Sequence, residues 1–441
     1  MELRFGRRPA PHRPTAAPEP AELAALIERY FRRNFVVNLL DGALFTLGMS
    51  FFAYSTIVPL FISKLTSSTV PIALAAMIAQ GGWMLPQLFT ANWAEQMQQR
   101  KPAVVRYSLL LERVPVWLMM GAALLANRSA ILALVVFLLA FALRGLGGGA
   151  VGPAWLDMIA RIIPVEKRGR LVGLMFFLGT GSGLAGSVLS AWFLDRYAFP
   201  YNFALNFGVA AVIQMLSWIV LNQVYEPEWP ANPSRQNQRQ FFAGLLPLLQ
   251  GDKAFRRFLS ARGLMCLGNM GAGFLVVAAV QRWSVPDSTV GIYTGAQLLG
   301  QMLGTPVIGY LADRFGHKLS LELSAFAFLL AFTLAWQATA AAWYYVVFVL
   351  LGVAMGAVLV SGSMSALEYA TPDRRPTYVG IANSAMGVIY MAGPLLAVGL
   401  VSAGYGLIFA LSAAFNLLAL VALVAWVQDP RSPASASQVR P

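Results

Sequence analysis

Four ionisable side chains stand inside otherwise apolar stretches of this 441-residue chain: Asp41, Glu112, Arg113 and Arg144. A charge within a membrane span costs at least about 2.5–3.5 kcal/mol, so it should face protein or water and usually has a function. Carboxylates near guanidinium groups in that setting are suited to proton coupling. A structural ion pair is the alternative, as is an Asp41 side chain that reaches the membrane surface. Adjacent Glu112 and Arg113 point about 100° apart on a helix, so we expect separate partners.

The sequence gives little support for metal binding, hydrolysis or nucleotide binding. One cysteine, Cys266, and two histidines provide no His/Cys metal cluster and no Ser-His-Asp hydrolase. The segment 181–186 has the glycine spacing of a dinucleotide loop, but it lies in an apolar run without strands, which favours close helix packing. The chain has no G-x-x-x-x-G-K-[ST] sequence for ATP. We therefore expect no metal, no cofactor and no enzymatic activity.

The apolar stretches that hold the four charges predict an all-α polytopic membrane protein. Hydrophobic residues make up 58% of the chain and charged residues 12%, about half the charge of a soluble domain. Two uncharged runs, 323–367 and 376–428, are each long enough for two spans. The twelve transmembrane helices are expected at 34–62, 70–92, 104–126, 130–158, 169–194, 202–224, 258–281, 289–312, 319–337, 343–367, 377–401 and 405–427.

The basic residues predict the orientation of these spans. With an even number of spans both termini share one side, and that side holds 26 of the 32 lysines and arginines, against four on the other. Loops rich in Lys and Arg stay in the cytoplasm. Both termini should therefore be cytoplasmic in a plasma (inner) membrane protein. The formal charge of +13 is then a topology signal, and we expect no nucleic-acid partner.

The longest polar stretch, 226–250, divides the spans six and six. We expect a cytoplasmic tail at 1–33, in which 21–33 can form an amphipathic helix, an N-terminal six-helix bundle at 34–225, a central cytoplasmic loop at 226–257, a C-terminal six-helix bundle at 258–428 and a second tail at 429–441. The halves echo each other, because Arg168 precedes Gly173 by five positions after helix 4, and Arg375 precedes Gly380 after helix 10. Repeated six-helix halves are typical of transporters.

A loop sequence links the chain to a family. Gly309-Tyr-Leu-Ala-Asp313-Arg314-Phe-Gly316-His-Lys318 resembles the G-x-x-x-D-R-x-G-R/H-K signature of the major facilitator superfamily, and it lies between helices 8 and 9, where that family repeats it. Between helices 2 and 3, Glu95, Arg100 and Lys101 keep the charges, while Gln96 replaces the arginine. The segment 144–148 is similar to a helix-4 signature tied to proton coupling in some branches. The branch stays unresolved.

The resemblance implies two pseudo-symmetric bundles, with helices 1, 4, 7 and 10 around a central cavity that Asp41 and Arg144 can reach. It also implies a latch that locks the cytoplasmic ends together in the outward-open state. In this latch Asp313 faces the N-terminus of helix 5 and Arg314 pairs with Glu368, while Glu95 and Arg100 or Lys101 act likewise on helix 11 and Asp157. The expected latch residues are Glu95, Arg100, Lys101, Asp157, Arg168, Gly309, Asp313, Arg314, Gly316, Lys318, Glu368 and Arg375.

Polar or amphipathic side chains within the spans are candidates for the substrate cavity, with helix bridging as the alternative. They are Asn38, Tyr54, Gln80, Trp155, Asn269, Gln297, Gln301, Asn383 and Tyr390.

These patterns predict a secondary active transporter of a small molecule that works by alternating access and is coupled to protons. Efflux of a small amphipathic compound is slightly favoured over uptake of a metabolite. Few charges lie on the cavity helices, which disfavours highly charged substrates, although Arg144 can hold one carboxylate. A non-transporting membrane sensor or assembly factor with the same fold is the alternative, and it gains if Asp41 and Arg144 point into packed helix interfaces. The expected partners are the lipid bilayer, a small-molecule substrate and protons, and we expect a monomer.

Overall fold

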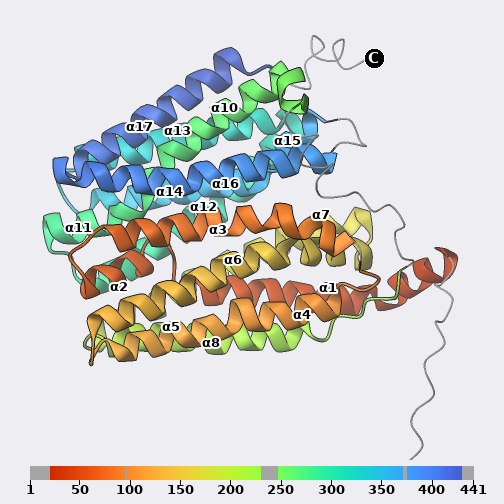
Figure 1. Ribbon diagram of the computed structural model, residues 1–441, viewed down its shortest axis with the longest axis horizontal. Coiled ribbons are helices and arrows are strands. Elements are labelled where there is room, and N and C mark those ends of the chain that lie inside the picture. Colours follow the sequence, from red (N-terminus) through yellow and green to blue (C-terminus); the bar gives the residue numbers. More distant parts are fainter. Residues whose placement is uncertain (1–19, 96, 230–246, 371–374, 430–441) are drawn as a thin grey trace, which may run out of the picture.

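The computed structural model describes residues 20–95, 97–229, 247–370 and 375–429, and every regular element in these ranges is a helix. The helices form two bundles that lie side by side, one from each half of the chain (Figure 1). The first and last described residues lie at the same end of the molecule, on the right in Figure 1, which we call the terminal end. The helices α2 and α11 lie at the opposite end.

The N-terminal bundle is built from residues 20–221. Its elements are α1 (Pro20–Ser50), α2 (Ile57–Leu65), α3 (Val70–Glu95), α4 (Lys101–Ser108), the π-helical turn η1 (Leu109–Arg113), α5 (Val114–Leu125), α6 (Ala130–Ile162), α7 (Val165–Arg196) and α8 (Tyr201–Leu221).

The C-terminal bundle is built from residues 253–426. Its elements are α10 (Lys253–Gly268), the 3-10 turn η2 (Asn269–Phe274), α11 (Leu275–Trp283), α12 (Asp287–Phe315), α13 (His317–Gln337), α14 (Trp343–Ser361), α15 (Met364–Glu368), α16 (Arg375–Leu400), the 3-10 turn η3 (Val401–Ala403), α17 (Tyr405–Val421) and the π-helical turn η4 (Ala422–Trp426).

The expected twelve-span, two-bundle architecture is confirmed. Within the described ranges, nine helical segments are long and apolar enough to cross a bilayer. The helices α1, α3 and α12, with 31, 26 and 29 residues, complete the set, since about 20 helical residues cross the hydrocarbon core. Between the bundles, α7 packs on α12 and α3 packs on α16.

Two spans are interrupted at equivalent places in the two halves. The expected span 34–62 breaks at residues 51–56 between α1 and α2, where Pro59 in the first turn of α2 has no N–H for the helical ladder. The expected span 258–281 breaks at η2 (Asn269–Phe274), where Gly271 and Gly273 weaken the helix. The first helix also begins early, because α1 starts at Pro20 and includes the expected amphipathic segment.

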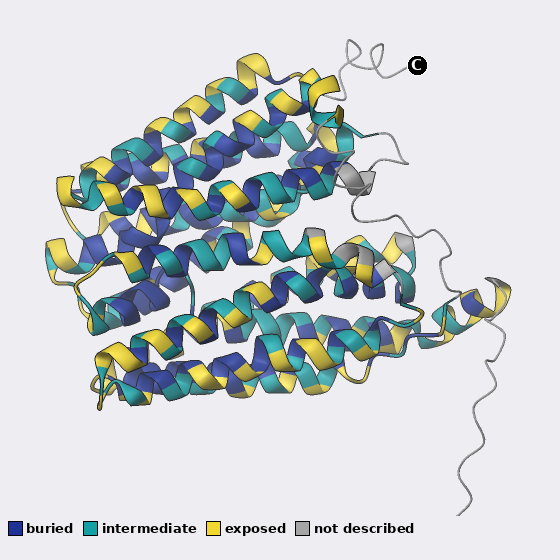
Figure 2. Cartoon of the chain, in the orientation of Figure 1, coloured by how far each residue is buried: buried dark blue, intermediate teal, exposed yellow. Residues whose placement is uncertain are grey.

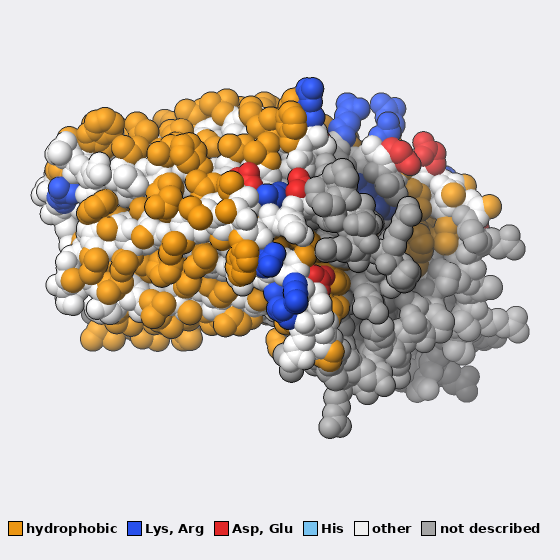
Figure 3. Space-filling model, turned by 90° about the horizontal axis from the view of Figure 1, so that it is seen from above, with side chains coloured by type: hydrophobic (Ala, Val, Ile, Leu, Met, Phe, Trp, Pro, Cys, Tyr) orange, Lys and Arg blue, Asp and Glu red, His pale blue; other side chains and the backbone are white. Residues whose placement is uncertain are grey.

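The outer surface of the bundles is apolar. Exposed residues follow the outward faces of the helices, and buried residues line the contacts between helices (Figure 2). Ile131, Leu139 and Val188 are each at least 67% exposed. Hydrophobic side chains cover most of the described part of the face in Figure 3, and its charged side chains gather mainly toward one end. A surface of this kind meets lipid rather than water.

Candidate functional site

Three of the four expected charges form one buried cluster inside the N-terminal bundle. Arg113 on η1 forms an ion pair with the carboxylate of its neighbour Glu112. The Nη2 atom of Arg113 also lies 3.7 Å from Asp41 Oδ1 on α1. The Ser217 hydroxyl, on α8, donates a 2.5 Å hydrogen bond to the same Asp41 oxygen. Asp41, Glu112 and Arg113 are at most 6% exposed. Two carboxylates therefore share one guanidinium group at the junction of three helices.

The expectation that Glu112 and Arg113 have separate partners is wrong, because they pair with each other. The cause is local. Residues Leu109–Arg113 form a π-helical turn, in which Val114 donates its N–H to the Leu109 carbonyl and successive residues rotate less than in an α-helix. Pro115 follows at once, and its missing N–H leaves the ordinary α-helical ladder incomplete there. The π turn thus lets two adjacent charges converge on one face.

Small residues of α6 allow this approach. A methyl group at Gly148 would lie 2.9 Å from Glu112 Oε1 and 2.7 Å from the Trp83 ring, closer than side-chain atoms normally come. One turn further on, a methyl group at Gly152 would be 3.7 Å from the Trp83 ring, an ordinary contact. The run Gly147–Gly149 therefore serves helix packing, as expected for small residues in a membrane bundle.

Arg144, the fourth charge, also lies on α6. Its guanidinium carbon is 4.6 Å from the centre of the Phe52 ring and 5.6 Å from that of Phe45, at cation–π distance. Glu112 and Arg113 are its electrostatic neighbours. Within the described part of the chain, the buried Nε and Nη2 atoms of Arg144 have no hydrogen-bond partner. Buried donors of this kind usually find an acceptor, and a carboxylate ligand supplies two in the right geometry.

Asp41 and Arg144 have different surroundings. Asp41 is 4% exposed and points into the packed contact of α1 with α8 and η1, where Ser217 and Arg113 hold it. Arg144 is partly exposed and lies against the rings of Phe45 on α1 and Phe52 just after α1. Of these two side chains Arg144 is the more exposed, whereas Asp41 is held against Arg113.

Several of the expected cavity residues lie at the contact between the two bundles. Asn269 Nδ2 donates to Gln80 Oε1 at 3.4 Å, and Asn383 Nδ2 is 3.5 Å from Gln87 Oε1. Tyr54 lies with its hydroxyl 3.7 Å from Met355 Sδ.

The remaining cavity candidates have varied partners. Gln297 Oε1 accepts a 2.6 Å hydrogen bond from Ser55 across the bundle contact. Gln301 lies where α12 contacts α14, and Tyr390 belongs to a small cluster with Cys266 and Met386. Asn38 is fully buried and donates to the carbonyl of Asn34, and Trp155 packs within the N-terminal bundle.

Contacts that the sequence did not single out close the opposite end of the molecule. Lys64 at the end of α2 forms a 2.8 Å ion pair with Asp287 at the start of α12. One step inward, the hydroxyl groups of Thr56 and Thr294 are 2.6 Å apart. Short polar side chains carry little signal in an apolar run, so only the tertiary structure identifies them.

The contact between α7 and α12 loosens toward the terminal end. A methyl group on Gly291 would lie 2.7 Å from the backbone of Ala191, and one on Gly181 would lie 3.7 Å from Met302 Sδ. Gly309 is two turns further along the same face of α12, and a methyl group there would have no neighbour within 4 Å. The two bundles are therefore joined at the opposite end and separate along these helices toward the terminal end.

Of the expected latch residues, the structure joins Arg100 and Asp157 within the N-terminal bundle, with 2.6 Å between Arg100 Nε and Asp157 Oδ2. Arg161, which the sequence reasoning missed, lies 3.2 Å from the same carboxylate oxygen. Glu226, also missed, accepts hydrogen bonds from the backbone N–H groups of Arg100 and Lys101. The sequence does not show that Arg161 and Glu226 lie next to these residues, because the contacts depend on how the helices pack.

The other latch residues lie at the terminal end. Arg168 donates to the Ile163 carbonyl at 2.9 Å, and Arg314 donates to the Tyr310 hydroxyl at 3.1 Å. Lys318 pairs with Glu322 at 3.4 Å. Asp313 is exposed at the end of α12, Gly316 follows it with a positive φ of 96°, and Glu368 ends α15. The side chains of Glu95 and Arg375 lie outside the described part of the structure.

Known proteins share both the sequence pattern and the fold. The pattern of the Major Facilitator Superfamily matches residues 108–283 and 258–441. The metabolite transport protein YyaJ of Bacillus subtilis is 39% identical over 66 residues, which are 15% of this chain and 14% of YyaJ. The 4-hydroxybenzoate transporter PcaK of Pseudomonas aeruginosa is 31% identical over 102 residues, 23% of this chain and 22% of PcaK.

The matched segments thus span less than a quarter of these relatives. A solved D-xylose-proton symporter superposes with a TM-score of 0.67 at 14% identity, over 91% of this chain and 99% of that one. At this identity the likeness establishes the fold. Together with the family match over most of the chain, it indicates a transporter rather than an enzyme. The chain belongs to the Major Facilitator Superfamily of membrane transporters.

Proposed function

We propose that this protein moves a small organic anion across the plasma membrane by alternating access, with proton coupling through Asp41, Glu112, Arg113 and Arg144. The observation that carries the proposal is Arg144. It is a cation within a membrane span, with two buried N–H donors unpaired in the described structure and an ion-pair cluster beside it. A cation held in this way is well suited to bind a carboxylate and to sense the charge of its neighbours.

Charge balance gives a physical basis for the coupling. Two carboxylates and two guanidinium groups sum to zero in a region where an uncompensated charge is costly. Protonation of Asp41 or Glu112 leaves one positive charge in excess, and a bound carboxylate at Arg144 restores the balance. The bound proton therefore favours binding of the anion. By linkage, the bound anion favours binding of the proton to the same extent.

The relatives and the local side chains support an aromatic or amphipathic carboxylate as the substrate. The names of two relatives specify 4-hydroxybenzoate. Phe45 and Phe52, which already face Arg144, offer flat apolar surfaces next to the cation. An aromatic acid matches both features, with its carboxylate on Arg144 and its ring against the phenylalanines.

The joined opposite end and the separated α7 and α12 support an inward-facing state in which the latch is open. This assignment rests on the charge distribution, which favours a cytoplasmic position for the terminal end and both chain termini. Outward opening then requires α7 and α12 to approach each other near Gly309 and the latch charges to engage. A monomer suffices for this cycle, because both bundles come from one chain.

The mutual preference of proton and anion supports movement of both together, and therefore uptake. Efflux, which the sequence favours, requires instead that the proton and the anion bind in alternation and exchange. A non-transporting sensor is the second candidate function, and the packed position of Asp41 is the observation in its favour.

The test is flux into and out of proteoliposomes with an imposed pH gradient of either sign, using radiolabelled 4-hydroxybenzoate and a panel of neutral and anionic metabolites. We expect a flux that follows the gradient, and an apparent affinity for the anion that falls about 10- to 100-fold in Arg144→Gln, as for a lost charged hydrogen bond. Arg144→Lys should recover part of it, and Arg128→Gln, an exposed matched control, should not change it.

Asp41→Asn should leave a flux that no longer follows the pH gradient. If no compound of the panel moves and the protein is folded, transport is refuted in favour of the sensor. If flux occurs without dependence on the gradient in the wild type, the proton coupling is refuted.

A further inference from the structure

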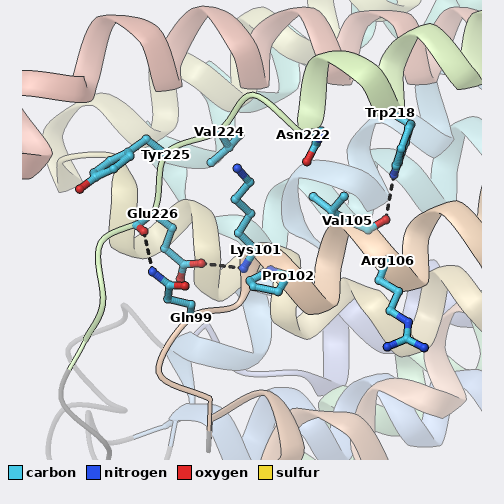
Figure 4. Close-up of a pocket in the computed structure, with 10 residues that line it drawn as sticks. All are labelled: Gln99, Lys101, Pro102, Val105, Arg106, Trp218, Asn222, Val224, Tyr225 and Glu226. Atoms are coloured by element: carbon cyan, nitrogen blue, oxygen red, sulfur yellow. Dashed lines mark hydrogen bonds between the residues drawn. The ribbon is translucent and has the colours of Figure 1, made fainter. Parts of the chain in front are cut away.

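A cavity of about 520 Å³ lies outside the charge cluster that the proposed function uses. It opens between α4, the end of α8 and the segment 224–226 that follows α8, at the terminal end of the N-terminal bundle (Figure 4). Lys101, Arg106, Trp218, Asn222 and Tyr225 contribute to its wall. Lys101 is also an expected latch residue, but the proposed transport cycle assigns no role to the cavity itself.

The cavity has an excess of positive charge. Figure 4 shows the Lys101 side chain extending across it toward Val224, while the guanidinium of Arg106 points outward at the rim. Arg33 is a further cation near Lys101. Within the described ranges, neither Lys101 nor Arg106 has an ion pair among those found.

Among the described residues that line the cavity, Glu226 is the carboxylate, and one of its oxygens is engaged, while Oε1 has no hydrogen-bond partner in the described ranges. Glu226 is 5% exposed, and its Oε2 atom accepts hydrogen bonds from the backbone N–H groups of Arg100 at 2.7 Å and Lys101 at 2.6 Å. It caps the first turn of α4, where a negative charge is favourable. The charge of Glu226 acts on the Lys101 ammonium group, but no ion pair in the described ranges joins them, so the ammonium group can still meet another anion.

The position suits a lipid. Lys101 begins α4 and Leu221 ends α8, so the cavity lies at the level where the helices leave the membrane. Below it, the outward faces of these spans expose Leu110, Leu216 and Ile219, each by 47–48%, which gives acyl chains an apolar path. The Trp218 indole donates to the Val105 carbonyl at 2.8 Å, and amphipathic rings of this kind favour the membrane surface.

We propose that this cavity binds the phosphate group of an anionic phospholipid. Lys101 neutralises the phosphate, the side-chain amide of Asn222 can donate to it, and Arg106 at the rim attracts the headgroup. Basic pockets between transmembrane helices on the cytoplasmic side are suited to such headgroups. The bound lipid joins α4, α8 and the start of the central loop, and so holds the N-terminal bundle at the membrane surface.

Native mass spectrometry of the full-length protein in detergent tests this inference, with phosphatidylglycerol and phosphatidylcholine as the probes. We expect phosphatidylglycerol to bind more tightly than phosphatidylcholine in the wild type. In the double variant Lys101→Gln/Arg106→Gln its dissociation constant should rise roughly 25-fold, since two basic groups contribute about 2 kcal/mol in total. The charge-preserving variant Lys101→Arg/Arg106→Lys should bind nearly as the wild type does.

The matched control is Lys167→Gln/Arg170→Gln, which removes two exposed charges from α7 at the same end of the molecule. It should leave the affinity unchanged. Equal weakening by both double variants overturns the proposal, because binding would then follow net charge. Unchanged binding in Lys101→Gln/Arg106→Gln overturns it as well. Competition by millimolar glycerol 3-phosphate that displaces the lipid completely would assign the cavity to a soluble phosphate and overturn the lipid assignment.

The circular dichroism spectrum and the unfolding temperature of every variant serve as the folding control. If the Gln double variant is unfolded, the single variants Lys101→Gln and Arg106→Gln decide the matter. Each should weaken phosphatidylglycerol binding about fivefold, and no weakening in either overturns the proposal.

Discussion

The Glu226 carboxylate accepts a 2.6 Å hydrogen bond from the backbone N–H of Lys101, and so fastens the start of the central loop to the first turn of α4. Glu226 follows α8, and 125 residues separate the two partners in sequence. The contact joins the loop that connects the two bundles to one turn of the N-terminal bundle. A movement of that loop would therefore also displace the first turn of α4.

Stability should depend on pH through Glu226. Burial raises the pKa of this carboxyl above its ordinary value near 4.5, although the hydrogen bonds from Lys101 and Arg100 lower it. The folded state then binds the proton more tightly than the unfolded state, so this group's contribution to stability falls as the pH rises through and above 4.5. In Glu226→Gln that part of the pH dependence should vanish.

The measurement is the unfolding temperature of detergent-solubilised protein from pH 4 to pH 8, taken as the difference between wild type and variant. Glu228→Gln, an exposed neighbour in the same segment, is the control and should follow the wild type. A constant difference between wild type and Glu226→Gln across the range would contradict the prediction.

Gly148→Ala should destabilise the N-terminal bundle. The added methyl group would lie 2.9 Å from Glu112 Oε1 and 2.7 Å from the Trp83 ring, and overpacking of this kind costs about 1–3 kcal/mol. Gly152→Ala on the same helix meets the Trp83 ring only at 3.7 Å and should be neutral or stabilising. Thermal unfolding of the two variants checks this, and equal behaviour would show that α6 does not need a glycine beside Glu112.

Lys64 and Asp287 should bias the protein toward the state in which the opposite end is closed. Their ion pair is partly exposed, at 34% and 20%, so its contribution should be about 0.2–1 kcal/mol. Lys64→Gln should thus shift the balance of states by up to about fivefold. Distances between spin labels at the ends of α2 and α11 report the shift, and Lys64→Asp/Asp287→Lys should restore the wild-type distribution if the pair itself is responsible.

Gly309→Leu should impair transport without destabilising the state seen in the structure. A Cβ atom at this position would have no neighbour within 4 Å in the structure, but a leucine side chain would stand between α7 and α12 when their terminal ends close. Gly399→Leu on α16, where the added group is also without neighbours, is the matched control. We expect slower flux with an unchanged unfolding temperature for the first variant alone. Normal flux would argue against closure of the two helices at this level.

Asp313→Asn should lower transport while the protein still inserts into the membrane. If Asp313 faces the N-terminus of α7 in the outward-open state, the lost charge costs about 0.3–1 kcal/mol, which is a two- to fivefold change in the balance of states. Flux in proteoliposomes and the amount of protein in the membrane fraction are the measurements. Asp195→Asn, an exposed control near the end of α7, should transport normally, and normal transport by Asp313→Asn as well would rule out the latch.

The amino-acid sequence determined the twelve spans and their division into two bundles. The free energy of transfer from water to lipid dominates the energetics of such segments. The positions and lengths of the uncharged runs in the sequence therefore predict the spans directly. The family signature at Gly309–Lys318 was equally local, because its residues follow one another in the chain. The sequence also singled out Asp41, Glu112, Arg113 and Arg144, since the cost of an intramembrane charge can be read from position alone.

Only the tertiary structure decided which of these charges meet. The π turn at Leu109–Arg113 reversed the expected separation of Glu112 and Arg113, and Ser217 reached Asp41 from 176 residues away. Glu226 and Thr294 looked like ordinary polar residues in the sequence. Hydrogen bonds and ion pairs act over about 3–4 Å, so the partners of a side chain depend on how helices distant in the chain are packed. The hydropathy of the sequence does not predict that packing.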